Sequence, residues 1–295
     1  MPRDASPDTA RVLVIGEALV DVVDDQAFPG GSPLNVAIGL QRLGIPTTLH
    51  SSFGADPHGV AIAQHLEESG VSVTPGTVSD RETSVARAMI AADGAASYTF
   101  SITWDPGPAD TAGFALVHTG SIGAALEPGA TEVETLLATT DALVSYDPNI
   151  RPALMGDHAT ALARVERFVA LADVVKASDE DVAWLYPDAT VAEVLQRWLA
   201  LGPRLVVVTR GGAGADALAA AGPVHVDAAS TEVVDTIGAG DSFTAGMLAA
   251  LLTTGFGDVA GALRFAARCA GITVSRPGAD PPTSDELAPS SGADD

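Results

Sequence analysis

Short apolar runs alternate with amphipathic stretches along most of the chain. The apolar runs are rich in β-branched and aliphatic residues, and the amphipathic stretches have the length and spacing of helices. The predicted strands include residues 12–15, 143–146, 174–175 and 205–208, and the predicted helices include residues 60–69 and 191–201. Continuous apolar strands between helices indicate a parallel sheet covered on both faces. The pattern therefore predicts an α/β fold.

One segment departs from this alternation. Residues 84–90 and 97–102 flank Asp93-Gly94, a dipeptide that favours a hairpin turn. Because the strands of a hairpin are antiparallel, this pair is predicted to lie outside the main sheet. Two interpretations of this pair are open: it is either an element that serves the function or an ordinary surface hairpin.

The two ends of the chain lack periodicity and are rich in Pro, Ser, Ala and Asp. Residues 1–10 and 284–295 are therefore predicted to be disordered tails around a domain at residues 11–283. The first residues lack the basic start and longer apolar core of a signal peptide, and no run of 18 apolar residues could span a membrane. We expect a cytoplasmic protein without a membrane partner.

Composition narrows the possible partners. Thirty-eight acidic and fifteen basic residues give a formal charge of −23, which disfavours nucleic acid, since phosphate neutralisation requires Lys and Arg. A bound nucleotide would depend on local fields from helix N-termini, a few arginines and Mg²⁺. The single cysteine, Cys269, lies in an apolar stretch, which predicts a buried, unreactive thiol and fits a reducing compartment.

The most informative segment is a glycine-rich turn that leads into an apolar helix. Residues 235–248 read Asp-Thr-Ile-Gly-Ala-Gly-Asp-Ser-Phe-Thr-Ala-Gly-Met-Leu. The amides of Gly238, Ala239 and Gly240 are predicted to converge at the positive end of the helix and to bind phosphate. Asp241 would lie beside that phosphate, where a carboxylate can act as the general base for an attacking hydroxyl. A capped helix after a flexible loop is the structural alternative.

A second loop leads into a helix near the other end of the chain. Residues 28–44 contain a Gly30-Gly31 pair, followed by Ser32 as a predicted N-cap. Asn35 in the first turn can point back toward the glycines, whose bare backbone allows close approach. Because an amide both donates and accepts hydrogen bonds, a sugar could lie against this loop. A helix cap with a turn-forming glycine pair is the alternative.

Together the two segments resemble the paired signatures of the ribokinase-like (PfkB) sugar kinases. The resemblance covers about residues 11–283, and residues 118–122, 146–152 and 176–186 are most similar to bacterial fructokinases. It implies a three-layer fold with a central, mostly parallel sheet, helices on both faces, and a small β-sheet lid. The lid would comprise residues of about 21–29 and 83–104.

The resemblance also implies contacts to the substrate. Asp21 corresponds to the family's sugar-binding acid, and Arg151 to an arginine at the sugar and phosphate end. Arg87 is a further candidate, because a guanidinium offers a fork of donors. Solvated or ion-paired surface residues are the alternative for all three. The full set of predicted substrate-binding residues is Asp21, Gly30, Gly31, Asn35, Arg87, Arg151 and Asp241.

For the nucleotide, Thr209, Gly211 and Gly214 resemble the family's Thr-x-Gly-x-x-Gly motif. The chain has no Gly-x4-Gly-Lys-Ser/Thr sequence, so scattered elements would hold the phosphates. The predicted ATP-binding residues are Lys176, Ser178, Thr209, Gly211, Gly214, Gly238 and Gly240.

The metal sites are predicted from weaker matches. Ser178 and Asp181 replace the family's Asn-x-x-Glu near the metal, and Asp181 could hold Mg²⁺ through water. Asp235 corresponds to a residue that helps to order a K⁺ site, although a loop-capping aspartate is the alternative.

The implied activity is transfer of the γ-phosphoryl group of Mg·ATP to a primary hydroxyl of a small sugar. D-fructose is the first candidate, and ribose, 2-keto-3-deoxygluconate and nucleosides are alternatives within the family. A dinucleotide-dependent dehydrogenase is disfavoured because no Gly-x-Gly-x-x-Gly follows the first strand. A catalytically silent sugar-binding relative is a third alternative, and the family also implies a homodimer.

Overall fold

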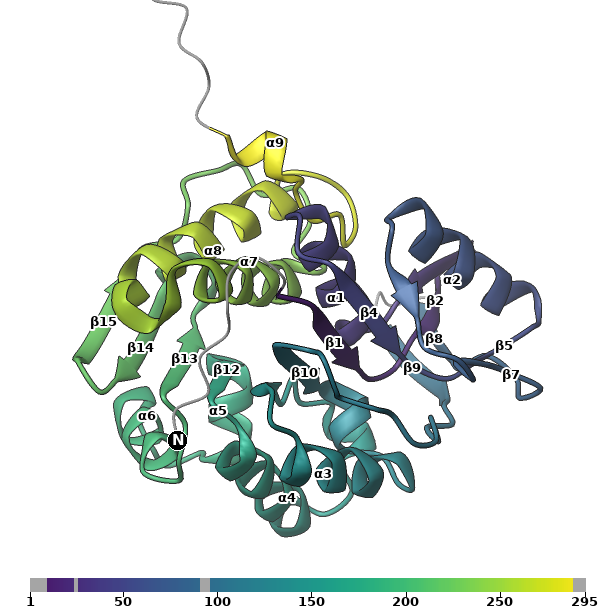
Figure 1. Cartoon of the computed structure of the whole chain (residues 1–295), viewed down its shortest axis with the longest axis horizontal. Coiled ribbons are helices and arrows are strands. Elements are labelled where there is room, and N and C mark those ends of the chain that lie inside the picture. Colours follow the sequence, from purple (N-terminus) through teal and green to yellow (C-terminus); the bar gives the residue numbers. More distant parts are fainter. Residues whose placement is uncertain (1–9, 24–25, 91–95, 289–295) are drawn as a thin grey trace, which may run out of the picture.

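The computed structural model describes residues 10–23, 26–90 and 96–288. Within them, a nine-stranded sheet has the order β15-β14-β13-β12-β11-β10-β1-β4-β6 (Figure 1). Neighbouring strands from β6 to β13 are parallel, and β14 and β15 are antiparallel. The strands are β1 (Val12–Ile15), β4 (Thr47–His50), β6 (Ser72–Val73), β10 (Leu116–Gly120), β11 (Leu143–Asp147), β12 (Val174–Ser178), β13 (Leu205–Thr209), β14 (Ala215–Ala219) and β15 (Gly222–Val226). The mostly parallel sheet is confirmed.

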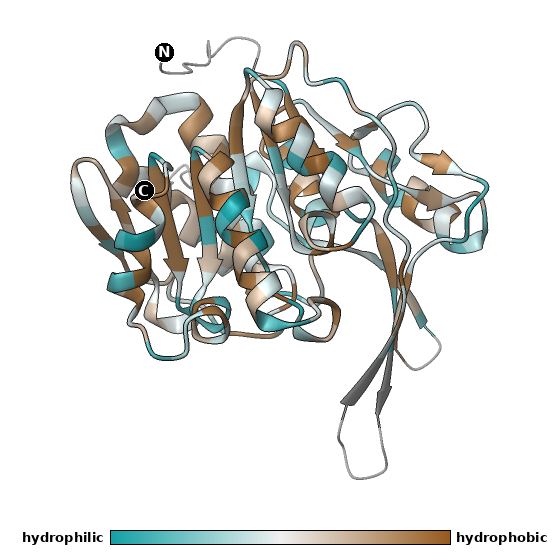
Figure 2. Ribbon diagram, turned by 90° about the horizontal axis from the view of Figure 1, so that it is seen from below, coloured by the Kyte–Doolittle hydropathy of each residue, from teal (hydrophilic) through white to brown (hydrophobic). Residues whose placement is uncertain are grey.

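Helices cover both faces of this sheet. One layer comprises α1 (Ser32–Arg42), α7 (Ala239–Thr254) and α8 (Val259–Val274), and the other comprises α3 (Gly129–Thr139), α4 (His158–Leu171), α5 (Asp179–Leu185) and α6 (Val191–Leu199). In β13, Leu205 and Val207 belong to the core under the first layer, while Val206 and Val208 belong to the core under the second. Apolar side chains on both faces explain why the central strands are mainly hydrophobic (Figure 2).

A separate small sheet lies beside the main one. It has the order β3-β2-β8-β9, with β2 (Leu19–Val23), β3 (Gln26–Gly30), β8 (Val85–Ile90) and β9 (Ala96–Ser101). The predicted antiparallel pair is confirmed by β8 and β9, whereas its Asp93-Gly94 turn lies outside the described residues. Helix α2 (Pro57–Glu68) packs against β2 and β3. The strands β5 (Phe53–Gly54) and β7 (Val78–Ser79), which precede and follow α2 in the chain, form a separate short parallel pair.

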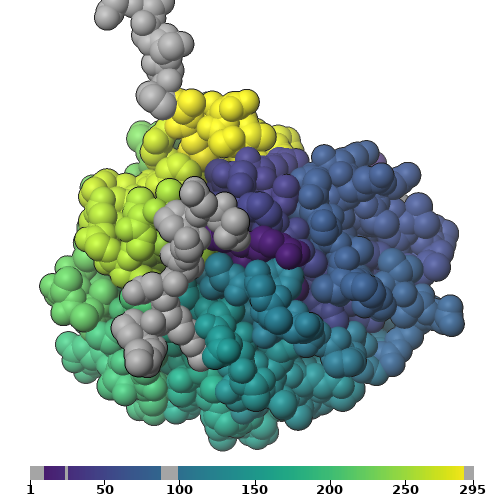
Figure 3. All heavy atoms as spheres, viewed as in Figure 1, coloured from purple at the N-terminus to yellow at the C-terminus, as the bar shows by residue number. Residues whose placement is uncertain are grey.

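The prediction of a disordered C-terminal tail is wrong for the first residues of that segment. Residues Ser284–Leu287 form α9, whose N-cap Thr283 accepts a hydrogen bond from the Glu286 amide. Glu286 also pairs with Arg276, and the Leu287 side chain is buried. A four-residue helix is too short to show periodicity, so the sequence pattern could not reveal it. The C-terminal residues, yellow in Figure 3, lie against the body of the protein.

By length and composition alone, Ala239–Val274 is apolar enough to cross a membrane. In the structure this stretch is α7, a turn at Gly255–Asp258, and α8. The two helices pack against each other, and α7 also packs against α1. Their apolar residues therefore belong to the protein core.

Candidate active site

The order of strands reverses beside β1, where β4 and β6 extend to one side and β10 to β13 to the other. In open α/β sheets, ligands bind at the carboxyl ends of the strands at such a point. A cavity of about 490 Å³ lies there. Its lining includes Glu17, Asp21, Ser32, Asn35, Ser121, Asn149, Arg151, Lys176, Ser178, Asp181, Thr209, Gly238, Gly240 and Asp241. Segments from both ends of the chain thus meet in one site.

Asp241 lies in the first turn of α7, after Gly238 in the left-handed conformation with φ 74°. One carboxylate oxygen accepts a hydrogen bond from Ser32 Oγ at 2.6 Å, and the other accepts one from Asn35 Nδ2 at 2.8 Å. Burial raises the pKa of Asp241, while these two hydrogen bonds and the charge of Lys176 counteract the rise. The two glycine-rich segments of the sequence therefore converge on this carboxylate.

Ser32 does not cap its helix as predicted. The N-cap of α1 is Gly31, with φ 112°, and no side chain caps the helix. A Cβ atom at Gly31 would lie 2.6 Å from the Glu17 carbonyl oxygen, so only glycine fits there. The Ser32 hydroxyl instead donates across the site to Asp241, which comes from a segment far away in the sequence.

The three predicted phosphate-binding residues have different surroundings. Gly238 and Gly240 line the cavity, whereas Ala239 lines an adjacent one. The Ala239 amide donates to the Thr236 carbonyl oxygen at 3.3 Å. A phosphate that used this amide would therefore compete with a long hydrogen bond inside the turn.

The predicted substrate residues Asp21 and Arg151 both line the cavity. Burial raises the pKa of the Asp21 carboxyl, and the charge of Arg151 counteracts that rise. The Arg151 guanidinium donates to Asn149 Oδ1 at 2.7 Å. A Cβ atom at Gly30 would lie 2.6 Å from Asp21 Oδ2, so bare backbone at this position leaves room for the carboxylate.

The structure does not place Arg87 in this cavity. Ala86, its neighbour in β8, lines the cavity, and successive side chains of a strand point to opposite faces. Arg87 is accordingly exposed. Its proposed contact with the substrate is not supported, because the sequence did not reveal which face of the hairpin is turned inward.

Glu17 is a site residue that the sequence analysis missed. Its carboxyl is 3% exposed, lines the cavity and accepts a hydrogen bond from the Gly123 amide at 2.9 Å. Burial raises its pKa to about 7, against the lowering effects of its hydrogen bonds with Ser121 and Gly123 and of the charge of Arg151. An acid two residues after the β1 strand, at the carboxyl edge of a parallel sheet, was the available signal.

The residues predicted near the metal form a helix cap. The Ser178 hydroxyl accepts from the Asp181 amide at 3.0 Å, and Asp181 Oδ2 accepts from the Ser178 amide at 2.8 Å. Asp181 Oδ1 accepts from the Ile150 amide at 2.7 Å. Both oxygens of this carboxylate are thus engaged with protein, an arrangement that fits a water-mediated contact to Mg²⁺.

Asp235 caps a loop. Its two carboxylate oxygens accept from the amides of Ile237 at 3.0 Å and Gly278 at 2.9 Å. This arrangement corresponds to the loop-capping alternative. Within the described residues, no group of three or more His, Cys, Asp or Glu side chains is arranged to hold a metal ion.

A second cavity of about 470 Å³ adjoins the first and shares Thr209, Gly211, Thr236 and Gly240 with it. Its lining is largely apolar and includes Val233, Phe243, Ala267, Ala270 and Val274. The predicted residue Gly214 also lines it, with φ +83°, and a Cβ atom there would lie 2.0 Å from the Val226 carbonyl oxygen. The polar cavity at Asp241 thus continues into an apolar one of suitable size for an aromatic base.

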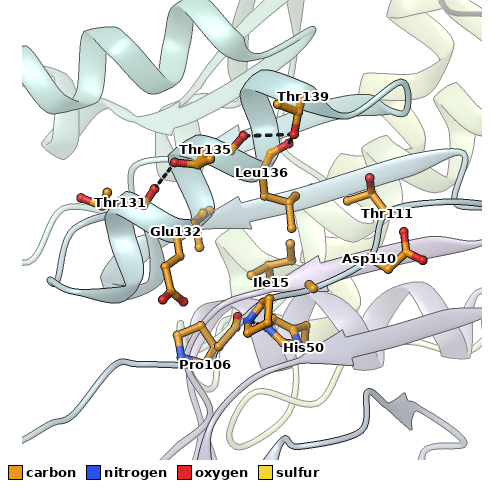
Figure 4. Close-up of a pocket in the computed structure, with 14 residues that line it drawn as sticks. Ile15, His50, Pro106, Asp110, Thr111, Thr131, Glu132, Thr135, Leu136 and Thr139 are labelled. Atoms are coloured by element: carbon orange, nitrogen blue, oxygen red, sulfur yellow. Dashed lines mark hydrogen bonds between the residues drawn. The ribbon is translucent and has the colours of Figure 1, made fainter.

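A third hollow of about 510 Å³ lies between α3 and residues 106–111 (Figure 4). Its lining contains none of the predicted site residues. The hydroxyls of Thr135 and Thr139 donate to carbonyl oxygens of their own helix, and the His50 ring nitrogens bond to Thr74 and Gly107. These polar groups are therefore occupied with local structure.

Residues 3–286 match the model of the pfkB family carbohydrate kinases. The chain belongs to this family. It is 34% identical to a fructokinase of Rhizobium leguminosarum bv. trifolii, over 81% of this chain and 79% of the relative. It is 33% identical to a fructokinase of Salmonella typhimurium, over 83% and 86%. The ribokinase-like resemblance inferred from the two motifs is confirmed, and the protein is a carbohydrate kinase.

Solved structures agree with this assignment. A fructokinase from Vibrio cholerae O395 in its fructose, ADP and calcium ion bound form superposes with a TM-score of 0.80 and 28% identity, covering 92% of this chain and 94% of that one. An aminoimidazole riboside kinase from Salmonella enterica, complexed with aminoimidazole riboside and an ATP analogue, gives 0.79 and 25%, covering 94% and 98%. The ribokinase-like fold is therefore confirmed together with the family.

Proposed function

We propose that this pfkB-family kinase transfers the γ-phosphoryl group of ATP to the primary hydroxyl of D-fructose and forms fructose 6-phosphate. The observation that carries the proposal is the position of Asp241 in the first turn of α7, where its carboxylate accepts a hydrogen bond from Asn35 in the first turn of α1. Fructose is favoured because the relatives at 34% and 33% identity are fructokinases. The adjoining apolar cavity supports a nucleotide as the second substrate.

In this proposal the sugar lies in the polar cavity. Asp21 and Asn35 bind its hydroxyls, and Arg151 lies at the edge of the same cavity. Asp241 removes the proton from the attacking hydroxyl, whose oxygen bonds to the γ-phosphorus as the bond to the bridging oxygen of ADP breaks. The amides around Gly238 and Gly240 stabilise the negative charge of the transferred group. Catalysis then comes mainly from positioning and charge stabilisation.

The raised pKa of Asp241 fits this role, since a carboxylate with a raised pKa is a stronger base than an ordinary one. Mg²⁺ would neutralise part of the charge on the ATP phosphates, with Asp181 reached through water. K⁺ near Asp235 remains a prediction. We further propose a cytoplasmic location, which the buried single thiol of Cys269 supports.

The test is the Asp241→Asn variant. Asn keeps the shape of the side chain and removes its basicity, so the fold should persist while turnover of fructose falls by about 10²- to 10⁴-fold. Turnover is measured by ADP release, with circular dichroism as the check of folding. Near-normal turnover in a folded variant would exclude Asp241 as the base.

The same assay separates the alternative acceptors. Ribose, 2-keto-3-deoxygluconate and a nucleoside are compared with fructose at equal concentrations, using kcat/KM as the criterion. We expect fructose to have the highest value. A higher value for another acceptor would retain the kinase reaction and replace the sugar.

A further inference from the structure

Glu17 lies where the chain passes from the main sheet to the small sheet, between the last residue of β1 and the first residue of β2. Its carboxyl is almost completely buried and lines the cavity at Asp241, yet it takes no part in the proposed reaction. Because taking a carboxyl out of water is costly, its position requires an explanation. The contacts of Gly123 supply one.

Both backbone groups of Gly123 are bonded to connections between the two sheets. Its amide donates to Glu17 Oε2 at 2.9 Å, and its carbonyl oxygen accepts from Trp104 Nε1 at 2.9 Å. Glu17 precedes β2, the first strand of the small sheet, and Trp104 follows β9, the last one. The chain therefore first enters and finally leaves the small sheet through residues that are bonded to the same glycine.

The turn that contains Gly123, at Ser121–Ala124, is closely packed and strained. A Cβ atom at Gly123 would lie 2.7 Å from Gly16 Cα, so the turn touches the backbone beside Glu17. Ser121 has a φ of 51°, in the left-handed region that residues other than glycine rarely adopt. Such a conformation persists only where the surrounding contacts enforce it. The hydrogen bonds of Glu17 with Ser121 and Gly123 are contacts of this kind.

Glu17 also touches the start of α1, since a Cβ atom at Gly31 would lie 3.4 Å from Glu17 Cγ. Three walls of the cavity therefore meet at Glu17. They are the small sheet with Asp21, the turn with Ser121, and the start of α1 with Asn35. Glu17 does not line the adjoining apolar cavity, in which the nucleotide base is proposed to lie. Its contacts are thus confined to the side of the site that is proposed to hold the sugar.

We propose that Glu17 is a positioning residue for sugar binding, which acts through Gly123 and keeps the small sheet and the turn at Ser121–Ala124 in a fixed arrangement around the sugar. Trp104 has the same role at the other end of the small sheet. The inference rests on the proposed function, because it takes the polar cavity as the sugar site. No bond forms or breaks at Glu17, so its loss should change the affinity for the sugar more than the rate of phosphoryl transfer.

The first test is the Glu17→Met variant, which keeps the length of the side chain and removes its acceptor oxygens. The Gly123 amide then has no partner in the free enzyme, and binding of the sugar must restore the turn. We expect the KM for fructose to rise by about 5- to 100-fold, the equivalent of one unmade buried hydrogen bond. Because Asp241 and the apolar cavity are unchanged, kcat and the KM for Mg·ATP should stay within about threefold of wild type.

Glu17→Gln is the conservative variant. Its amide oxygen can accept from the Gly123 amide, and its amide nitrogen can donate to Ser121. The KM for fructose should therefore return to within about threefold of the wild-type value. A value as high as that of Glu17→Met would mean that the negative charge of Glu17 is required in place of its hydrogen bond, and would contradict the proposal.

Trp104→Phe tests the same turn from its other side and does not depend on the folding of Glu17→Met. It keeps an aromatic ring and leaves the buried Gly123 carbonyl oxygen without its donor, so we expect the KM for fructose to rise by about 5- to 20-fold. Trp198→Phe is the matched control. This tryptophan is also buried, and its Nε1 donates to Tyr186, outside the cavity at Asp241. The control should keep the wild-type KM for fructose.

A purely structural role is the competing explanation, and it predicts a loss of stability without a selective change in sugar affinity. Circular dichroism identifies the folded variants. The proposal is overturned if folded Trp104→Phe and Glu17→Met enzymes have a KM for fructose within about threefold of the Trp198→Phe value. It is also overturned if the KM for fructose and the KM for Mg·ATP rise by the same factor.

The outcomes distinguish this inference from the proposed function. If the wild-type enzyme phosphorylates another acceptor in place of fructose, the acceptor of the proposed function is wrong, and the variants are compared with that sugar. If the wild type phosphorylates fructose and loses turnover in Asp241→Asn, but the folded Glu17→Met and Trp104→Phe enzymes bind fructose normally, only the role of Glu17 is wrong.

Discussion

Glu17 lines the candidate active site and has almost no access to water. Its pKa of about 7, against the ordinary 4.5, means that the folded protein keeps a proton over a pH range in which the unfolded chain has lost it. A group of this kind lowers the stability of the fold as the pH rises. The hydrogen bond that Glu17 accepts from the Gly123 amide offsets part of the cost of burying the carboxyl. That amide belongs to the turn that follows β10.

We predict that Glu17→Gln removes this pH dependence. As the pH rises from 4.5 to about 7, the wild type should lose about 3 kcal/mol of unfolding free energy relative to the variant. Urea unfolding of both proteins at several pH values measures the difference, in which the effects of other groups cancel. The exposed Glu67→Gln is the control and should follow the wild type. Parallel curves for wild type and Glu17→Gln would contradict the prediction.

Two of the predicted residues that line the cavity, Gly31 and Gly238, belong to backbone motifs. Both glycines have a positive φ angle, a conformation that glycine adopts more readily than other residues. The residue type alone therefore indicates such positions. The role of Ser32 and the orientation of Arg87 depended on which side chains meet across the fold. Asp241, which receives the Ser32 hydroxyl, lies 209 residues away in the chain, so no local pattern could show the contact.

At the scale of single elements, the short helix α9 attaches the last described residues to the fold. We predict that Leu287→Ala lowers the unfolding free energy by about 2 to 5 kcal/mol, because the leucine side chain is 5% exposed and its removal leaves a cavity. Chemical denaturation measures the loss. Leu201→Ala, at a leucine that is 38% exposed, is the control and should cost much less. Equal effects at the two positions would show that α9 does not contribute to the stability of the domain.

The central strands were predictable and the sheet edge was not. The runs at β1 and β13 are β-branched and apolar on both faces, so their burial between helix layers follows from composition. The antiparallel strand β14 reads Ala-Asp-Ala-Leu-Ala, with no β-branched residue, and its partner β15 contains both Gly and Pro. Such strands form because β13 offers an unpaired edge, which is a property of the assembled sheet.

At the scale of the whole molecule, the charge of −23 opposes the binding of an anionic nucleotide. The groups proposed to attract it are local, namely the start of α7, Arg151 and the buried Lys176, all of which line the cavity at Asp241. Because salt screens exposed charges more than buried ones, added salt should weaken the long-range repulsion while the buried cation keeps most of its effect.

We therefore predict that the KM for Mg·ATP falls as ionic strength rises from about 0.02 M to about 0.2 M, a change that shortens the screening length from about 20 Å to about 7 Å. Steady-state kinetics in choline chloride, with Mg²⁺ and K⁺ held constant, measures the effect. The KM for fructose is the internal control, since a neutral sugar does not sense the net charge. A KM for Mg·ATP that rose with salt would mean that exposed positive groups at the site, such as Arg151, outweigh the acidic surface and that the protein attracts its nucleotide from a distance.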